Sequence, residues 1–144
     1  MNAKQISVRD LMNRDIKTIS RETGLMTAIE MMRNLDISSL IVEPDNDLDA
    51  YGIITRKDIV EALVENNPDI NSLLVEDLMT KPAITVNPEL SIYNCHQIMR
   101  MVGVRRMPVV DRGKLVGIIS NSDIFFKITR FFSSNEEEIP VLVP

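Results

Sequence analysis

Two eight-residue segments of this chain have similar sequences, and this repetition constrains the fold more than any other feature. Residues 52–59 read GIITRKDI and residues 117–124 read GIISNSDI, with five of the eight letters identical. The similarity extends upstream, where VRDLMNRDIKTIS, beginning at Val8, aligns with VEDLMTKPAITVN at an offset of 67 residues. A repeat of this length indicates a supersecondary unit that is present twice. Nearly the whole chain, from Val8 to about Arg130, is therefore predicted to be a tandem duplication.

Each copy shows the same order of elements: a short strand, a long helix, two further strands and a closing helix. Apolar residues recur at i, i+3, i+4, i+7 and i+10 through the long helix of each copy, which is the spacing of an amphipathic helix. The expected strands are residues 16–19, 38–42 and 50–54 in the first copy and 83–86, 106–110 and 115–119 in the second. The expected long helices are residues 25–35 and 92–102, and the expected closing helices are residues 58–65 and 123–130.

The predicted fold class is α+β, with tandem pseudo-two-fold β-α-β-β-α repeats and two small mixed sheets flanked by helices. One copy of about 60 residues could barely cover the apolar face of its own sheet, so we expect the two copies to pack around a pseudo-two-fold axis. We place the first repeat at 1–66 with its core from about residue 8, the connection at 67–74, the second repeat at 75–131 and a tail at 132–144. The Glu136–Glu138 run in that tail is expected to be solvated.

The composition is that of a soluble globular protein, and it excludes several classes of function. Apolar residues make up 44% and charged residues 26% of the chain, and no apolar run approaches the roughly 20 residues that a bilayer requires. The net charge of −5 argues against nucleic-acid binding, which needs a basic face. The first residues lack the features of a secretory signal, so we expect a cytoplasmic location.

Cysteine and histidine occur once each, which excludes an internal disulfide and a multi-histidine metal cluster. Cys95 and His96 both fall at positions of the second long helix that we expect to face the core, as an inert thiol and a packed imidazole. The sequence also lacks a P-loop, a Gly-rich dinucleotide fingerprint and a nucleophile–base arrangement. We therefore expect no enzyme activity, no metal site and no catalytic cofactor.

The hydroxyl and the acid of the repeated string stand three residues apart, and this spacing has two interpretations. In the first, Thr55 with Asp58 and Ser120 with Asp123 form helix capping boxes that satisfy amide groups at the start of each closing helix. In the second, the same helix start and carboxylate form a nucleotide cradle, because free amides attract phosphate and an acid accepts ribose hydroxyls. The pattern alone does not separate the cap from the cradle.

The order of the motifs resembles a CBS domain pair, also called a Bateman module. The chain reads DLM, IKTI, helix, SSLIV and GIITRKDI, and then DLM, AITV, helix, VRRMPVVD and GIISNSDI. The resemblance covers about residues 8–130 and implies a stand-alone tandem CBS protein. It also implies that adenosine-containing ligands bind in clefts between the two repeats. These ligands are AMP, ADP, ATP, S-adenosylmethionine and, in some members, NAD.

The resemblance further implies roles for individual residues. Asp58 and Asp123 would hold ribose hydroxyls, with Thr55 and Ser120 touching ribose or phosphate. Backbone groups on the first strand of each repeat would receive the adenine edge, and arginine side chains would meet phosphates. The complete set of implied ligand-binding residues is Ile16, Lys17, Thr55, Arg56, Asp58, Ala83, Ile84, Arg105, Arg106, Ser120 and Asp123.

The two copies differ where phosphate would bind. The first copy has Ser38 and Ser39 at the positions where the second has Arg105 and Arg106. We therefore expect the cleft that holds Asp123 and Arg105 to bind an adenine nucleotide better than the other cleft.

The expected function is that of a regulatory module that senses adenine nucleotides and signals to an effector protein in trans. Binding would favour one arrangement of the two copies, and the closing helices would pass that change on. Family pairs commonly dimerise through these helices, and the apolar face of residues 124–132 predicts a homodimer. The alternative is a ligand-independent dimerisation or scaffolding module, in which both hydroxyl–Asp strings are only caps.

Overall fold

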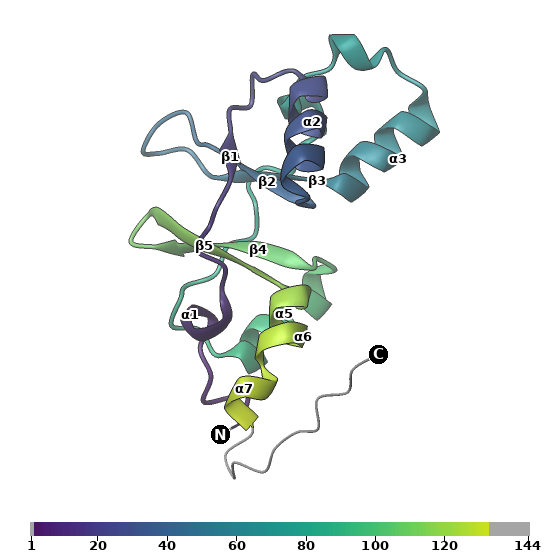
Figure 1. The fold of residues 1–144 in the computed structure, drawn as a ribbon. Coiled ribbons are helices and arrows are strands. Elements are labelled where there is room, and N and C mark those ends of the chain that lie inside the picture. The colour runs from purple at the N-terminus through teal and green to yellow at the C-terminus, as the bar shows by residue number, and fades with distance from the viewer. Residues whose placement is uncertain (1, 133–144) are drawn as a thin grey trace, which may run out of the picture. The chain divides into compact units, whose positions relative to one another are not determined.

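The computed structural model describes residues 2–132 (Figure 1). The described chain divides into two compact units: a central unit, Ile16–Ile84, and a terminal unit formed by residues 2–15 and 85–132. Each unit has a small sheet and flanking helices, which confirms the predicted α+β class. None of the helices in residues 2–132 has both the length and the apolar character needed to cross a bilayer. The expected tail, apart from Phe132, lies outside the described residues.

The compact units divide the chain at different places from the sequence repeats. The short helix α1 (Val8–Leu11) opens the first repeat but belongs to the terminal unit, where Asn13 and Ile118 form an antiparallel bridge. The corresponding helix α4 (Val75–Leu78) opens the second repeat but belongs to the central unit. Each unit is therefore completed by the opening segment of the other repeat.

The central unit has a three-stranded sheet in the order β1-β2-β3, with helices beside it (Figure 1). Its elements are β1 (Thr18–Ile19), α2 (Leu25–Leu35), β2 (Ser39–Val42), β3 (Gly52–Thr55), α3 (Arg56–Asn66), the 3-10 turn η1 (Ile70–Ser72) and α4. β1 runs parallel to β2, and β2 runs antiparallel to β3 with Ser39 opposite Thr55. Side chains alternate along β2, so Leu40 and Val42 enter the core together with the apolar stripe of α2.

The terminal unit has a two-stranded antiparallel sheet, β4-β5. Its elements besides α1 are α5 (Ile92–Val102), β4 (Arg106–Asp111), β5 (Lys114–Ser120), α6 (Asn121–Lys127) and α7 (Thr129–Phe132). The predicted first strand of the second repeat is wrong, because only a parallel bridge between Val86 and Val109 forms there. In the central unit the Ile41 amide donates to the Lys17 carbonyl at 3.1 Å, whereas Pro108 at the matching position has no N–H to donate.

The two closing helices also differ from each other. The first is continuous as α3, which includes the predicted residues 58–65. The second was expected as one helix over residues 123–130, but a turn at Ile128 separates α6 from α7. The long helices α2 and α5 have the predicted bounds.

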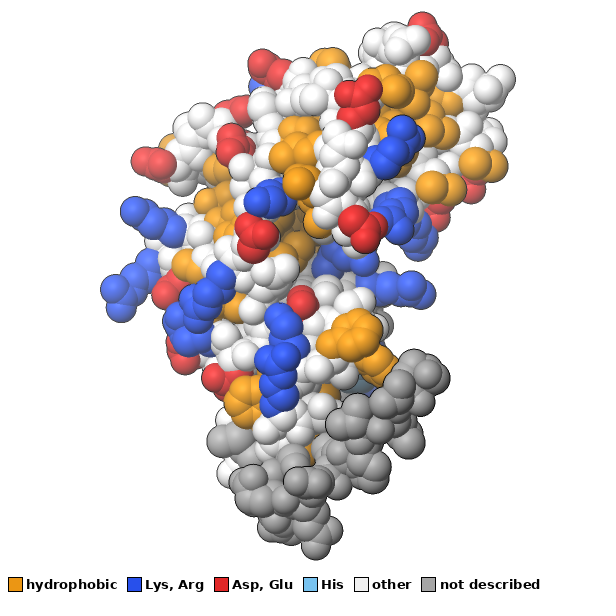
Figure 2. Space-filling model, viewed as in Figure 1, with side chains coloured by type: hydrophobic (Ala, Val, Ile, Leu, Met, Phe, Trp, Pro, Cys, Tyr) orange, Lys and Arg blue, Asp and Glu red, His pale blue; other side chains and the backbone are white. Residues whose placement is uncertain are grey.

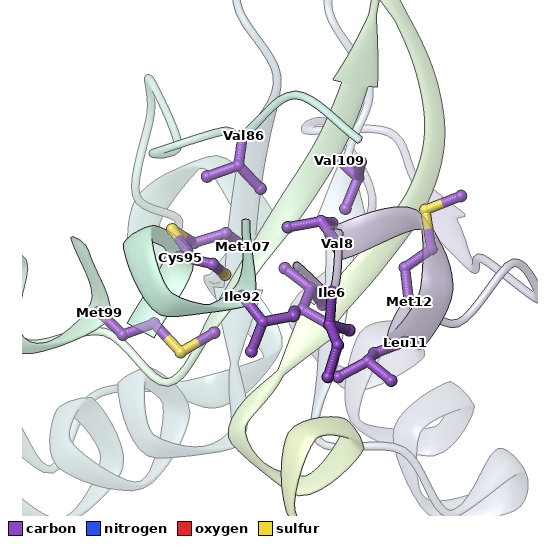
Figure 3. Close-up of a cluster of buried hydrophobic side chains, with 11 residues drawn as sticks. Ile6, Val8, Leu11, Met12, Val86, Ile92, Cys95, Met99, Met107 and Val109 are labelled. Atoms are coloured by element: carbon purple, nitrogen blue, oxygen red, sulfur yellow. The ribbon is translucent and has the colours of Figure 1, made fainter. Parts of the chain in front are cut away.

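The core of the terminal unit is assembled from segments far apart in the chain (Figure 3). Ile6 and Val8, near the N-terminus, lie in one buried cluster with Ile92 and Cys95 from α5 and Met107 from β4. This arrangement confirms the expected burial of the single cysteine. Burial raises the pKa of the Cys95 thiol to about 11, so the thiolate that reacts with oxidants is disfavoured.

The expectation for His96 is wrong, because its side chain is exposed on α5. The buried face of this helix is centred on Ile92, Cys95 and Met99, at the spacing i, i+3 and i+7. His96 follows Cys95 directly and is therefore turned about 100° away from the centre of that face.

Candidate functional site

The two closing helices begin with the same hydrogen-bonded corner. At the start of α3, the hydroxyl and the amide of Thr55 both donate to Asp58 Oδ2, at 2.8 and 3.0 Å. In return, the Asp58 amide donates to Thr55 Oγ1 at 3.2 Å. At the start of α6, Ser120 and Asp123 make the same three contacts at 2.8, 3.0 and 3.1 Å. We refer to Thr55 with Asp58 as the Asp58 corner and to Ser120 with Asp123 as the Asp123 corner.

The capping interpretation is confirmed at both corners, and the same device recurs in the fold. Asp10 accepts the amide of the residue that precedes α1, and Asp77 does the same before α4, at 2.9 and 2.8 Å. The difference is one of burial, because Asp10 and Asp77 are exposed whereas Asp58 and Asp123 are half-buried. Cap geometry is therefore a general property of this fold and does not identify a ligand site by itself.

The first backbone amides of both closing helices are largely satisfied within the chain. The Arg56 amide donates to the Ser38 carbonyl at 2.9 Å, and the Asn121 amide donates to the Arg105 carbonyl at 2.8 Å. The N-cap amide and the third helical amide are used in the corner itself. The helix starts therefore have few free amides for a phosphate, and the carboxylates are the groups with remaining capacity.

The second carboxylate oxygen distinguishes the two corners. Within residues 2–132, Oδ1 of Asp58 makes no hydrogen bond or ion pair. Oδ1 of Asp123 lies 3.3 Å from the Lys127 ammonium, which also donates to the Leu11 carbonyl at 3.1 Å. Sequence reasoning missed Lys127, although its i,i+4 spacing from Asp123 was a usable signal. The contact with Leu11, 116 residues away, had no such signal.

The three predicted ligand-binding arginines are neighbours of the two corners in the chain, in the β4-β5 register or through a backbone hydrogen bond. The Arg105 carbonyl accepts the Asn121 amide at the start of α6, and Arg106 pairs with Ser120 in the β4-β5 register. Arg56 follows Thr55 directly, and its guanidinium donates to the Ile37 carbonyl at 3.4 Å. Their contact with phosphate stays a prediction.

The four residues predicted to meet adenine, Ile16, Lys17, Ala83 and Ile84, all belong to the central unit. The Lys17 carbonyl accepts an amide from β2, and the Ala83 amide donates to the Tyr51 carbonyl at 2.8 Å. Among the described residues, the backbone groups of Ile16 and Ile84 make no hydrogen bond. Ile16 and Ile84 therefore have backbone donors and acceptors to spare, and their role with adenine stays a prediction.

Across residues 2–132, no three His, Cys, Asp or Glu side chains are grouped so that they could hold a metal ion.

Comparison with known proteins decides the family. The CBS domain family model matches residues 8–65 and 75–130. The chain belongs to the CBS domain family. As a CBS pair it is a regulatory module of a kind that generally binds nucleotides, and such modules are typically not enzymes.

Three similar proteins illustrate the range of chains that contain this module. An inosine-5'-monophosphate dehydrogenase from Korarchaeum cryptofilum is 37% identical over 126 residues, which is 87% of this chain and 25% of the dehydrogenase. Hypoxic response protein 1 from Mycobacterium tuberculosis is 30% identical over 118 residues, which is 82% of each chain. The solved structure of a hexameric CBS-CP12 protein from bloom-forming cyanobacteria has a TM-score of 0.83 and 32% identity, over 92% of this chain and 76% of that one. This CBS pair spans about a quarter of the dehydrogenase, so the similarity concerns the module and not the enzyme's activity.

Proposed function

We propose that this CBS pair is a sensor of adenosine-containing ligands, with AMP, ADP and ATP foremost and S-adenosylmethionine or NAD as further candidates. The observation that carries the proposal is the state of the Asp58 carboxylate. One of its oxygens is held by Thr55, while the other is unengaged within the described residues although the side chain is half-buried. This free oxygen is open to solvent, and as a charged acceptor it forms a stronger hydrogen bond with a hydroxyl donor than a neutral acceptor does.

A ribose is a suitable source of such donors. Its two neighbouring hydroxyls can both donate to one carboxylate, as they do to the acidic residue of dinucleotide-binding folds. The corner contacts hold the Asp58 side chain in one orientation, so little rotamer entropy is lost when a diol binds. This chemistry favours ribosides over the free base.

The remaining parts of the ligand have candidate contacts in the same chain. The backbone groups of Ile16 and Ile84 could pair with the polar edge of adenine, which has both donors and acceptors. Arg56, Arg105 and Arg106 could contact phosphate oxygens through their planar, always charged guanidinium groups. In this proposal the ligand favours one arrangement of the module over another, and the closing helices signal the change to an effector in trans.

A thermal-shift panel with AMP, ADP, ATP, S-adenosylmethionine and NAD tests the proposal. A ligand at 100 times its Kd stabilises the folded chain by about 2.7 kcal/mol, which corresponds to a rise in Tm of about 5–10 °C for a chain of this size. If the chain is the proposed sensor, at least one of these ligands should raise its Tm. A flat response across the panel, at ligand concentrations up to the millimolar range, contradicts it.

Asparagine variants separate ligand binding from helix capping. In Asp58→Asn and Asp123→Asn, the side-chain carbonyl can still accept the N-cap amide, but the anionic acceptor for a diol is lost. The double variant should fold and melt without responding to ligand. An unchanged response in the double variant would show that the ligand binds elsewhere.

We also propose that the module forms a homodimer through its closing helices. Val60 and Val64 on α3 are 53% and 77% exposed, and Phe125 and Phe126 on α6 are 73% and 72% exposed. Figure 2 shows hydrophobic side chains at the surface over both helices. Exposed apolar patches of this kind commonly mark interaction surfaces, and the similar CBS-CP12 protein is hexameric.

Light scattering coupled to gel filtration tests the homodimer. The double variant Phe125→Ser with Phe126→Ser should shift the mass toward the monomer. Leu48→Ser is the matched control, because Leu48 is 99% exposed but lies in the loop between β2 and β3. A wild-type mass equal to one chain contradicts the homodimer. A dimer without any ligand response supports the alternative of a ligand-independent scaffold.

A further inference from the structure

The two corners differ at one position of their closing helices. Lys127 stands four residues after Asp123, and Ala62 stands at the same place after Asp58. The Lys127 ammonium lies 3.3 Å from Asp123 Oδ1 and 3.1 Å from the Leu11 carbonyl oxygen. An alanine can make neither contact, so among the described residues only the Asp123 corner has a cation from the chain paired with its carboxylate.

This cation occupies the oxygen that a ligand would need. Ser120 already makes two hydrogen bonds to Asp123 Oδ2, and Lys127 takes Oδ1, so both oxygens of this carboxylate have partners in the chain. In Asp58 the equivalent Oδ2 is used in the same way, while Oδ1 is left without a partner among the described residues. The two carboxylates therefore differ in their remaining capacity to accept a hydroxyl.

Two further features keep Lys127 in place. The Lys127 and Asp123 side chains are only 28% and 16% exposed, so water competes weakly for this pair compared with a fully exposed one. The Leu11 carbonyl is one of the unpaired acceptors at the end of α1, where a cation is favourable. To leave Asp123, the ammonium must give up the Leu11 carbonyl or bend away from it.

We propose that Lys127 is a specificity-determining residue that closes the Asp123 corner, so that the chain takes its first adenosine ligand at the Asp58 corner. A ribose that donates both of its hydroxyls to Asp123 must first displace the Lys127 ammonium, because Ser120 already makes two hydrogen bonds to the other oxygen. This inference rests on the proposed function, because it assigns the ligand between the two corners of the same module. It reverses the order expected from the sequence, which weighed the positive charge of Arg105 and did not include Lys127.

The expectation based on Arg105 concerns the phosphate of the ligand, whereas the inference based on Lys127 concerns its ribose. Arg105 would act on phosphate, so its benefit is present with AMP and absent with adenosine. Lys127 acts on the acceptor of the ribose hydroxyls, so its removal should change the binding of AMP and adenosine alike. Comparing these two probes therefore separates competition for the carboxylate from a general effect of charge.

Isothermal titration calorimetry of the full chain with AMP and with adenosine tests the inference. In the Asp58→Ala background only the Asp123 corner remains, and adding Lys127→Met should tighten both ligands by about 2–5-fold, the range expected when a competing ion pair of this kind is removed. Lys114→Met is the matched control, because Lys114 begins β5 and its loss changes the net charge equally. It should leave both affinities unchanged in the same background.

The mirror variant provides an independent measurement. In the Asp123→Ala background only the Asp58 corner remains, and Ala62→Lys places an ammonium at the position that corresponds to Lys127. This change should weaken AMP and adenosine by a similar factor. Circular dichroism first establishes that each variant is folded, and Lys127→Gln replaces Lys127→Met if the methionine variant is not.

Several results would overturn the inference. One is equal affinity with and without Lys127 in the Asp58→Ala background, and another is weaker binding without it. A gain in affinity for AMP but not for adenosine would show that the charge of Lys127 matters and not its contact with Asp123 Oδ1. The same gain in affinity from Lys114→Met would show this as well. If the wild type and every variant bind neither probe, the inference fails; the proposed function fails as well only if the five-ligand panel is also flat, which is a different outcome from equal affinity in the two backgrounds.

Discussion

Gly117 is the position where the structure most clearly predicts the cost of a single methyl group. A Cβ at this residue would lie 2.7 Å from the Met12 sulfur and 3.0 Å from the Asn13 carbonyl oxygen. The sulfur is at the flexible part of a side chain and can move. The oxygen cannot move freely, because it accepts the Ile118 amide at 2.9 Å while the Asn13 amide donates back to Ile118 at 2.8 Å. Gly117→Ala must therefore disturb the bridge that joins the N-terminal segment to β5.

The expected cost follows from two opposing effects. Overpacking of a filled site costs about 1–3 kcal/mol, and replacing a strand glycine by alanine returns about 0.5–1 kcal/mol of backbone entropy. The net loss for Gly117→Ala is then about 1 kcal/mol from the middle of both ranges and at most about 2.5 kcal/mol, which lowers the Tm by about 2–10 °C. At Gly52, the matching position in the central unit, the nearest atoms are at 3.2 Å, so the loss should be smaller. At Gly24 no atom lies within 4 Å, and Gly24→Ala should be close to neutral.

Urea unfolding of the three alanine variants, followed by circular dichroism, measures this order. Hydrogen exchange adds a local readout, because the amides of Asn13 and Ile118 should exchange faster in Gly117→Ala than in the wild type. The reasoning is refuted if Gly117→Ala is as stable as Gly24→Ala, or if Gly52→Ala costs more than Gly117→Ala.

Three further predictions concern pH and helix capping. Lys81 donates to Asp49 at 2.5 Å and lowers the pKa of that carboxyl from 3.8, so the pair stabilises the folded chain above that pH. Lys81→Met should therefore melt below the wild type at pH 7, and the difference should close as the pH falls below 3.8; a constant difference contradicts this. Burial raises the pKa of the Cys95 thiol from 9.0 to about 11 in the folded chain, so the free energy of unfolding should decline as the pH rises between these values. Urea unfolding over this pH range should show the decline in the wild type and not in Cys95→Ala. Thr55→Ala and Ser120→Ala should each lose about 1 kcal/mol of unfolding free energy in urea, and an unchanged value would argue against the caps.

Much of the fold could be read from the sequence because its signals are local. The bounds of α2 and α5 follow from apolar spacing within eleven residues, and the caps at Thr55 and Ser120 follow from a hydroxyl three residues before an acid. The missing strand at residues 83–86 could not be read in this way. Its absence depends on Pro108, which lies more than twenty residues further along and has no amide to donate.

The same distinction between local and long-range signals applies to the candidate site. The repeated hydroxyl–Asp strings determined where both corners would lie, and the structure confirms the contacts within each corner. The sequence also predicted that the corners are unequal, from Arg105 and Arg106, but the ion pair between Lys127 and Asp123 was found only in the structure. Lys127 reaches Asp123 within its own helix, but the Leu11 carbonyl that helps to hold it comes from the other end of the chain.

The sequence by itself determined the duplication, the class of fold, the family and the two corners, because each depends on residues that are neighbours in the chain or on a repeated pattern. Tertiary structure decided which opening helix completes which unit and which glycine is crowded by Met12. It also decided which carboxylate has a free oxygen within the described residues. The first two features, and the Leu11 contact that helps to hold Lys127 at Asp123, depend on contacts between segments up to 116 residues apart, and no local spacing in the sequence encodes such contacts.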